Sequence, residues 1–161
     1  MTAARTPYQD TSVSVSKSQE TVRAALRAAG ARAVQFEEEW IRDAADENEA
    51  EAAVIRVRFV WAIGDAFDQT VRVRLEVRPL PPESGARGAW RVSPEQRERQ
   101  AWRALAWYLK TMLEAAAFGL LKFEDVFLSF VEGEDGRTVG ERVIPMLERG
   151  RLALTDGGGA S

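Results

Sequence analysis

Two segments near the middle of the chain alternate between apolar and charged residues, and they carry its clearest structural signal. They are residues 54–61, VIRVRFVW, and residues 71–78, VRVRLEVR. Because successive side chains of a β-strand point to opposite faces, each segment predicts a strand with one apolar face and one arginine-bearing face. Paired side by side, they predict a sheet with five arginines on the face away from the core: Arg56, Arg58, Arg72, Arg74 and Arg78.

Periodicity and capping residues predict the elements that precede these strands. Residues 16–30 have an apolar stripe at helical spacing, and Ser16 and Gln19 have the spacing of a capping box. Residues 33–41 alternate in part and predict a first strand. The acid-rich residues 43–51 predict the loop that follows it, so the N-terminal half reads as one helix and three strands.

Helices are predicted for the rest of the chain. Ser93, followed by proline, is a strong N-cap signal for a long helix that runs to Phe118. Residues 123–131 predict a second, aromatic-rich helix. A capping box at Thr138 opens a final helix that ends near Gly150.

These elements predict the α+β fold class. The expected architecture is an N-terminal helix, a three-stranded antiparallel sheet, then a long helix and two shorter C-terminal helices packed on one sheet face. A length of 161 residues, of which 45% are hydrophobic and 29% charged, suits a single domain. We expect that domain over residues 13–150, with flexible tails at residues 1–12 and 151–161.

The amino-acid composition excludes several kinds of catalytic and metal-binding site. The chain has no cysteine and no histidine, which removes disulfides, thiolate catalysis and the usual zinc ligand and general base. It also lacks a P-loop, a dinucleotide-binding glycine pattern and a serine nucleophile elbow. We therefore expect a non-enzymatic protein without cofactor or metal. With no apolar run of about 20 residues and no secretory signal, we expect it in the cytoplasm, away from the membrane.

The arginine-bearing face supports two interpretations. Arginines about 6.8 Å apart along a strand can follow the backbone of DNA or RNA without reading bases. Alternatively, Glu76 and the acidic run at residues 37–39 can pair with the arginines and leave a solvated surface with no ligand. Because the net charge is −3, any nucleic-acid site must be local. Our leading hypothesis is that the five arginines contact phosphates.

A protein-interaction module is the alternative function. Its partner would be a host protein, a phage protein or a second copy in a homo-oligomer. The aromatic C-terminal half would form the interface, because Trp107 and Tyr108 lie partly off the main apolar stripe of the long helix. The predicted interface residues are Trp107, Tyr108 and Phe127, supported by Phe123 and Phe130.

Several motifs of the C-terminal half resemble an uncharacterised family from bacteriophages and mobile elements. They are QAWRAL at residues 100–105, FEDVFL at 123–128, and DGRTVGE at 135–141 followed by PML at 145–147. The last motif departs from the family pattern, in which a tryptophan typically follows the glutamate, because this chain has Arg142 there. The resemblance implies a phage or prophage context and no established activity, so no catalytic residue is carried over.

Overall fold

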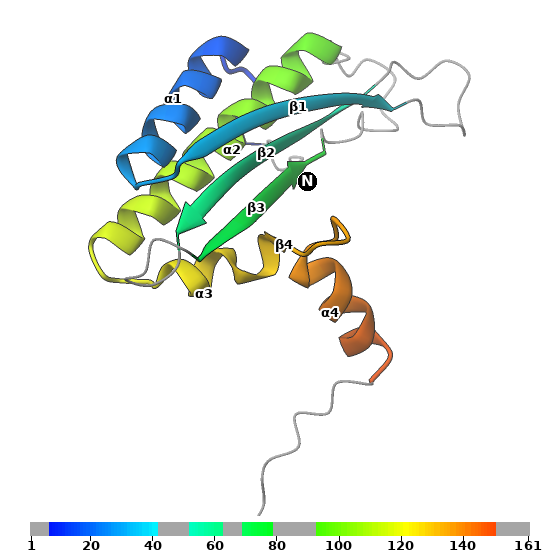
Figure 1. Cartoon of the computed structure of the whole chain (residues 1–161). Helices are drawn as coiled ribbons and strands as arrows, with labels where there is room; N and C mark the ends of the chain where they lie inside the picture. The colour runs from blue at the N-terminus through cyan, green and yellow to red at the C-terminus, as the bar shows by residue number, and fades with distance from the viewer. Residues whose placement is uncertain (1–6, 42–51, 63–68, 79–92, 151–161) are drawn as a thin grey trace, which may run out of the picture.

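The computed structural model describes residues 7–41, 52–62, 69–78 and 93–150, and these ranges form an α+β fold (Figure 1). The elements are α1 (Val15–Ala28), β1 (Ala33–Ile41), β2 (Ala52–Ala62), β3 (Thr70–Val77), α2 (Pro94–Ala117), α3 (Phe123–Phe127), the 3-10 helix η1 (Leu128–Phe130), β4 (Val131–Glu132) and α4 (Val139–Glu148). The strands in these ranges make one antiparallel sheet in the order β1-β2-β3-β4. The predicted fold class is therefore confirmed, with one strand more than expected.

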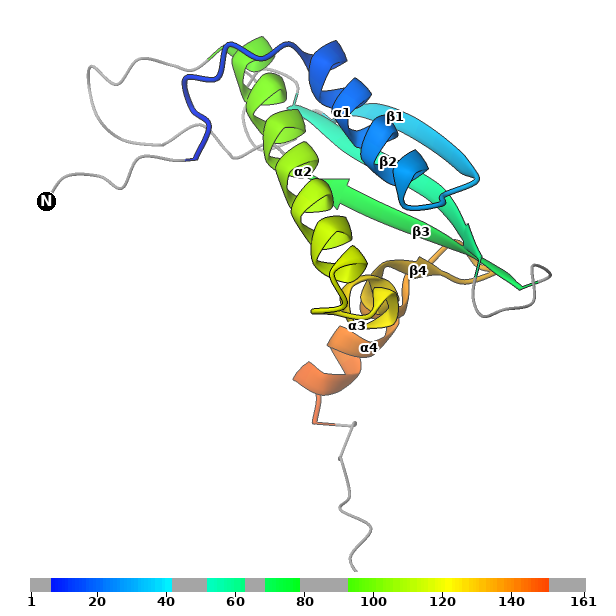
Figure 2. The same ribbon diagram turned by 90° about the vertical axis from the view of Figure 1, so that its left-hand side faces the viewer.

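The sheet has one covered face and one open face. Helices α1 and α2 pack against each other on the same side of the sheet, as the two views show (Figures 1 and 2). The opposite face points toward the viewer in Figure 1, and no described helix lies over it. The alternation in β2 and β3 explains this arrangement, because only the apolar side of each strand gains free energy by leaving water.

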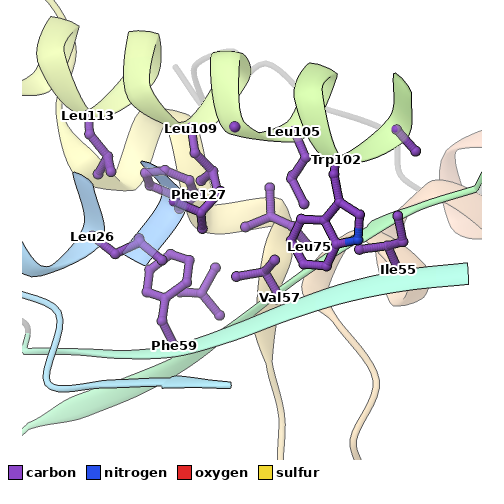
Figure 3. Packing of buried hydrophobic residues seen from close by; sticks show 14 residues of the cluster. Leu26, Ile55, Val57, Phe59, Leu75, Trp102, Leu105, Leu109, Leu113 and Phe127 are labelled. Carbon is purple, nitrogen blue, oxygen red and sulfur yellow. The ribbon is translucent and has the colours of Figure 1, made fainter. Parts of the chain in front are cut away.

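The core lies between α1, α2 and the sheet (Figure 3). Its largest fully buried side chains include Trp102 from α2, Phe59 from β2 and Phe127 from α3. The rings of Phe59 and Phe127 meet edge to face, with centroids 5.7 Å apart. The buried cluster is Val22, Leu26, Ile55, Val57, Phe59, Val73, Leu75, Ala101, Trp102, Leu105, Ala106, Leu109, Leu113 and Phe127.

The first helix begins earlier than the sequence pattern indicated. Its N-cap is Ser14, which has extended backbone angles and accepts a hydrogen bond from the backbone N–H of Lys17 at 3.2 Å. Ser16 lies exposed within the first turn, so the predicted capping box of Ser16 with Gln19 is wrong. A cap must sit just outside the helix to accept from its first free N–H groups, and Ser14 occupies that position.

The helix predicted over residues 123–131 is also wrong beyond its first turn. The chain instead forms α3 and η1, then pairs as β4 with β3, which sets Arg72 opposite Glu132. Helix α3 lies at one end of the sheet, where Phe127 joins the core, and α4 lies past β4 (Figure 1). The two short helices therefore do not both pack on the sheet face, because β4 diverts the chain to the sheet edge.

Part of the predicted N-terminal tail is held in place. The side-chain amide of Gln96 in α2 donates to the carbonyls of Gln9 and Thr11 at 3.0 and 2.9 Å, and that of Gln100 donates to Pro7 at 2.6 Å. Residues 7, 9 and 11 of the predicted tail therefore contact α2 through their backbone carbonyls. The rest of the predicted tails, at residues 1–6 and 151–161, and the acid-rich loop at 43–51 lie outside the described residues.

The remaining boundaries agree with the sequence expectations. Strand β1 covers residues 33–41 as predicted, and Ser93 caps α2 by accepting from the backbone N–H of Gln96 at 3.2 Å. Thr138 and Glu141 form the predicted capping box of α4. In the described ranges, no helix is both long and apolar enough to cross a bilayer.

Candidate interaction surfaces

Arg56 lies at the centre of the open sheet face, between acids on both neighbouring strands. The strand register sets Glu37 opposite it on β1 and Glu76 opposite it on β3. Its guanidinium reaches Glu39 through Nη1 at 2.6 Å and Glu76 through Nε at 2.9 Å. The guanidinium is largely buried by these neighbours. Partial burial lowers the local dielectric constant, and this strengthens the attraction between the Arg56 guanidinium and the two carboxylates.

The Arg56–Glu76 contact has the expected electrostatic signature. The hydrogen bond that Arg56 donates to Glu76, followed by the one it donates to Glu39, raises the pKa of Arg56 above its ordinary value. Burial alone would raise the pKa of Glu76, but hydrogen bonds from Arg56 and Arg78 outweigh it and lower the pKa. Each group thus stabilises the charged form of the other. Arg56 is paired with acids of the same chain.

Arg58 and Arg74 are paired in the same manner through the C-terminal segment. Arg58 bonds Glu37 and lies 3.4 Å from Glu132 of β4. Arg74 lies 3.8 Å from Glu132 and bonds Glu141 of α4 at 2.6 Å. These contacts join four strands and α4 in one network of alternating charge, so the two arginines also act as structural cross-links.

The remaining two arginines of the predicted nucleic-acid site are more accessible. Arg78 bonds Glu76 at 3.1 Å, yet its side chain remains 74% exposed. Arg72 is exposed, and among the described residues it has no ion-pair partner. The open face therefore brings all five predicted arginines together, but it also gathers five carboxylates: Glu37, Glu39, Glu76, Glu132 and Glu141.

Sequence reasoning identified part of this acidic set and missed the rest. Glu37, Glu39 and Glu76 sit at alternating positions within predicted strands, so they were expected as possible partners. Glu132 follows the helix predicted over residues 123–131 and Glu141 belongs to a predicted helix cap, and no sequence signal placed either near the arginines. Only the pairing of β4 with β3 brings them there.

A second candidate surface lies at the end of the molecule formed by α3, α4 and the turn after α2. We call it the apolar end surface, and its members are exposed large apolar residues. Phe118 is 81% exposed and Leu120 is 76% exposed, and both belong to the α2–α3 turn. The full set is Phe118, Leu120, Leu121, Leu128, Ile144, Met146 and Leu147. In Figure 1 this turn, α3 and α4 follow one another along the lower end of the molecule.

Helix α4 leaves most of its apolar residues in contact with solvent. It packs on η1 and β4 at its first turn, where Gly140 is buried against the backbone of Ser129. Farther along the helix, Ile144 and Leu147 are exposed by about half. An amphipathic helix is normally stabilised by burying its apolar stripe. Here only the start of α4 does so within the described residues.

The aromatic residues predicted for a protein interface fall into different environments. Trp107 is 56% exposed on α2. Tyr108 is half-buried beside the core, and burial raises the pKa of its hydroxyl. Phe127 is fully buried, and Phe123 stacks on Trp61 with centroids 4.1 Å apart. Phe127 therefore belongs to the core, because α3 turns it toward Phe59 and away from solvent.

The described residues contain no cluster of three or more acidic side chains placed to hold a metal ion. No protein-family model, curated protein or solved structure matches this chain. The resemblance to a bacteriophage family thus stays a prediction. The open sheet face and the apolar end surface are the two features of the structure that bear on function.

Proposed function

We propose that this chain is a non-enzymatic protein-interaction module that binds its partner on the apolar end surface. The supporting observation is the exposure of Phe118 and Leu120 in the α2–α3 turn and of Ile144 in α4, which lie along the lower end of the molecule in Figure 1. Large apolar side chains gathered on one surface are typical of interaction sites. Fully burying a leucine or phenylalanine yields about 1.5–3 kcal/mol, so a few such residues supply most of a binding energy.

The charge balance of the sheet face favours this proposal over nucleic-acid binding. Arg56, Arg58 and Arg74 each have two carboxylate neighbours. A phosphate would have to displace those carboxylates, and the gain from counterion release would be offset by the ion pairs lost. The motif resemblance at residues 135–147 supports a phage or mobile-element setting, where the partner is a host protein, a phage protein or a second copy.

Site-specific photo-cross-linking tests the proposal. A benzoylphenylalanine at position 120 should give one discrete cross-linked product in cells, and the same probe at the exposed position 27 of α1 should not. Phe118→Ser should abolish the product without changing the thermal unfolding of the protein. Sedimentation of the purified chain then tells a second copy from another protein. Equal labelling from both positions, or labelling unaffected by Phe118→Ser, would overturn the proposal.

Nucleic-acid backbone binding is the second candidate, favoured by the accessibility of Arg72 and Arg78. Fluorescence anisotropy with labelled single-stranded DNA, duplex DNA and RNA at low and physiological salt tests it. Arg72→Ala with Arg78→Ala should weaken binding and lower the salt slope by about 2. The control removes two exposed charges elsewhere, with Arg27→Ala and Lys110→Ala. Absence of binding at low salt would retire this candidate.

A further inference from the structure

Strand β1 has a long backbone edge that no other strand uses within the described residues. It is the outermost strand of the sheet and pairs with β2 alone across its nine residues (Figure 1). A free edge presents a row of backbone N–H and C=O groups that can pair with an added strand. Proteins often block such edges with proline or a bulge, but β1 contains no proline and keeps an unbroken register with β2.

The side chains along this edge are acidic on both faces of the sheet. Glu37 and Glu39 point to the open face, where they meet Arg58 and Arg56 from the inner side. Glu38 points to the helix side, as the register with Ile55 shows. Two of these three carboxylates are therefore already paired with arginines of β2, and Glu38 is the acid of this edge that has no such pair.

The acid on the helix side lacks a cationic partner. The indole N–H of Trp102 donates to Glu38 at 3.3 Å, and the carboxylate of Glu98 in α2 lies close enough to interact with it. Burial, followed by the charge of Glu38, raises the pKa of Glu98. The charge of Arg99 lowers the pKa of Glu98 without outweighing these effects, and neither carboxylate forms an ion pair among the described residues. Trp40, on the same face of β1, is 53% exposed.

We infer that the free edge of β1 accepts an extended, lysine- or arginine-rich segment of another protein as an added antiparallel or parallel strand. The backbone edge supplies the hydrogen bonds, the carboxylate of Glu38 with Glu98 beside it selects basic side chains, and Trp40 contacts an apolar or cationic neighbour. A second copy is disfavoured as the occupant, because pairing two β1 edges would bring the acidic runs together. This binding mode is independent of the apolar end surface.

A synthetic peptide tests the inference directly. The probe is acetyl-KVKVKVKVK-amide, titrated into the full chain labelled with nitrogen-15 and followed by NMR. Amide signals of β1 should shift at low salt. A peptide of the same sequence N-methylated at every residue should bind at least about tenfold more weakly, because neither of its edges can then donate to the ladder. The acidic analogue acetyl-EVEVEVEVE-amide should not bind.

Variants then test the charge selection. Glu38→Gln with Glu98→Gln should weaken binding of the basic peptide by about two- to fivefold. The control carries the same charge change at exposed positions away from the edge, Glu124→Gln with Glu134→Gln. Equal affinity for the N-methylated peptide, shifts away from β1, or no binding of the basic peptide would overturn the inference. Phe118→Ser should leave peptide binding unchanged, which separates this result from the fate of the apolar end surface.

Discussion

Glu132 of β4 holds its carboxylate 3.4 Å from the guanidinium of Arg58, which lies two strands away on β2. The same oxygen is 3.8 Å from Arg74 on the strand between them, and the Glu132 side chain is only 7% exposed. A carboxylate that has lost most of its water depends on such partners. This contact ties the short strand β4 to the centre of the sheet.

Replacing Glu132 should therefore destabilise the fold. Glu132→Gln removes the charge between Arg58 and Arg74 and leaves two half-shielded guanidinium groups near each other. We expect the free energy of unfolding to fall by about 1–3 kcal/mol in urea denaturation. The exposed neighbour supplies the control, since Glu134→Gln should change it by less than about 0.5 kcal/mol. Equal effects of the two changes would show that the buried pairing contributes nothing.

The attachment of α4 should depend on Gly140. A Cβ added there would lie 2.9 Å from the carbonyl oxygen of Ser129, a backbone atom that cannot move aside. Gly140→Ala should thus speed hydrogen exchange of the α4 amides at least about tenfold while β2 stays protected. Gly133→Ala is the contrast, because its Cβ would meet only side-chain atoms, those of Arg142 and Asp135, and no backbone atom. Unchanged exchange in Gly140→Ala would contradict this account of the α4 contact.

Because Glu38 and Glu98 lie close together, we expect Glu98→Gln to raise the melting temperature by an amount that depends on pH. The pKa of Glu98 is raised by burial and by Glu38, so its favourable contribution is present below the unfolded pKa and is lost as the pH rises through the folded pKa. Glu98→Gln mimics the protonated form. It should raise the melting temperature at pH 7 and have little effect at pH 4, measured by circular dichroism. A gain that is the same at both pH values would argue against charge repulsion as the cause.

Two residues predicted for one interface should behave differently on truncation. Phe127→Ala removes a fully buried ring that contacts Phe59, so we expect a loss of about 3–5 kcal/mol in the free energy of unfolding. Trp107→Ala removes a ring that is mostly solvent-exposed and should cost less than about 1 kcal/mol. Chemical denaturation of both variants measures this. A large loss for Trp107→Ala would mean that this ring supports the fold.

The helix cap of α1 offers a test that separates two neighbouring serines. Ser14→Ala removes the acceptor for the backbone N–H of Lys17 and should cost about 1 kcal/mol. Ser16→Ala, within the exposed first turn, should cost almost nothing or stabilise slightly through helix propensity. Thermal unfolding of the two variants compares them, and the reverse ranking would place the cap at Ser16.

The sequence by itself determined the elements whose pattern is local. Period-two alternation located β2 and β3 and assigned Ile55 and Val57 to the core, because strand geometry alone sends alternate side chains to opposite faces. Ser93 and Thr138 marked the starts of α2 and α4 through capping chemistry that operates within four residues. These signals need no knowledge of the rest of the chain.

Only the tertiary structure decided what the arginines and aromatic residues contact. Glu132 meets Arg58 because β4 adds to the edge of the sheet beside β3, and the paired residues, such as Arg72 and Glu132, are about 60 positions apart in the sequence. Phe127 is buried and Phe118 is exposed for the same kind of reason: both are apolar, and the packing of α3 against the sheet buries one and leaves the other in solvent. Burial depends on long-range packing, so composition along the chain could name the candidate residues but could not sort surface from core.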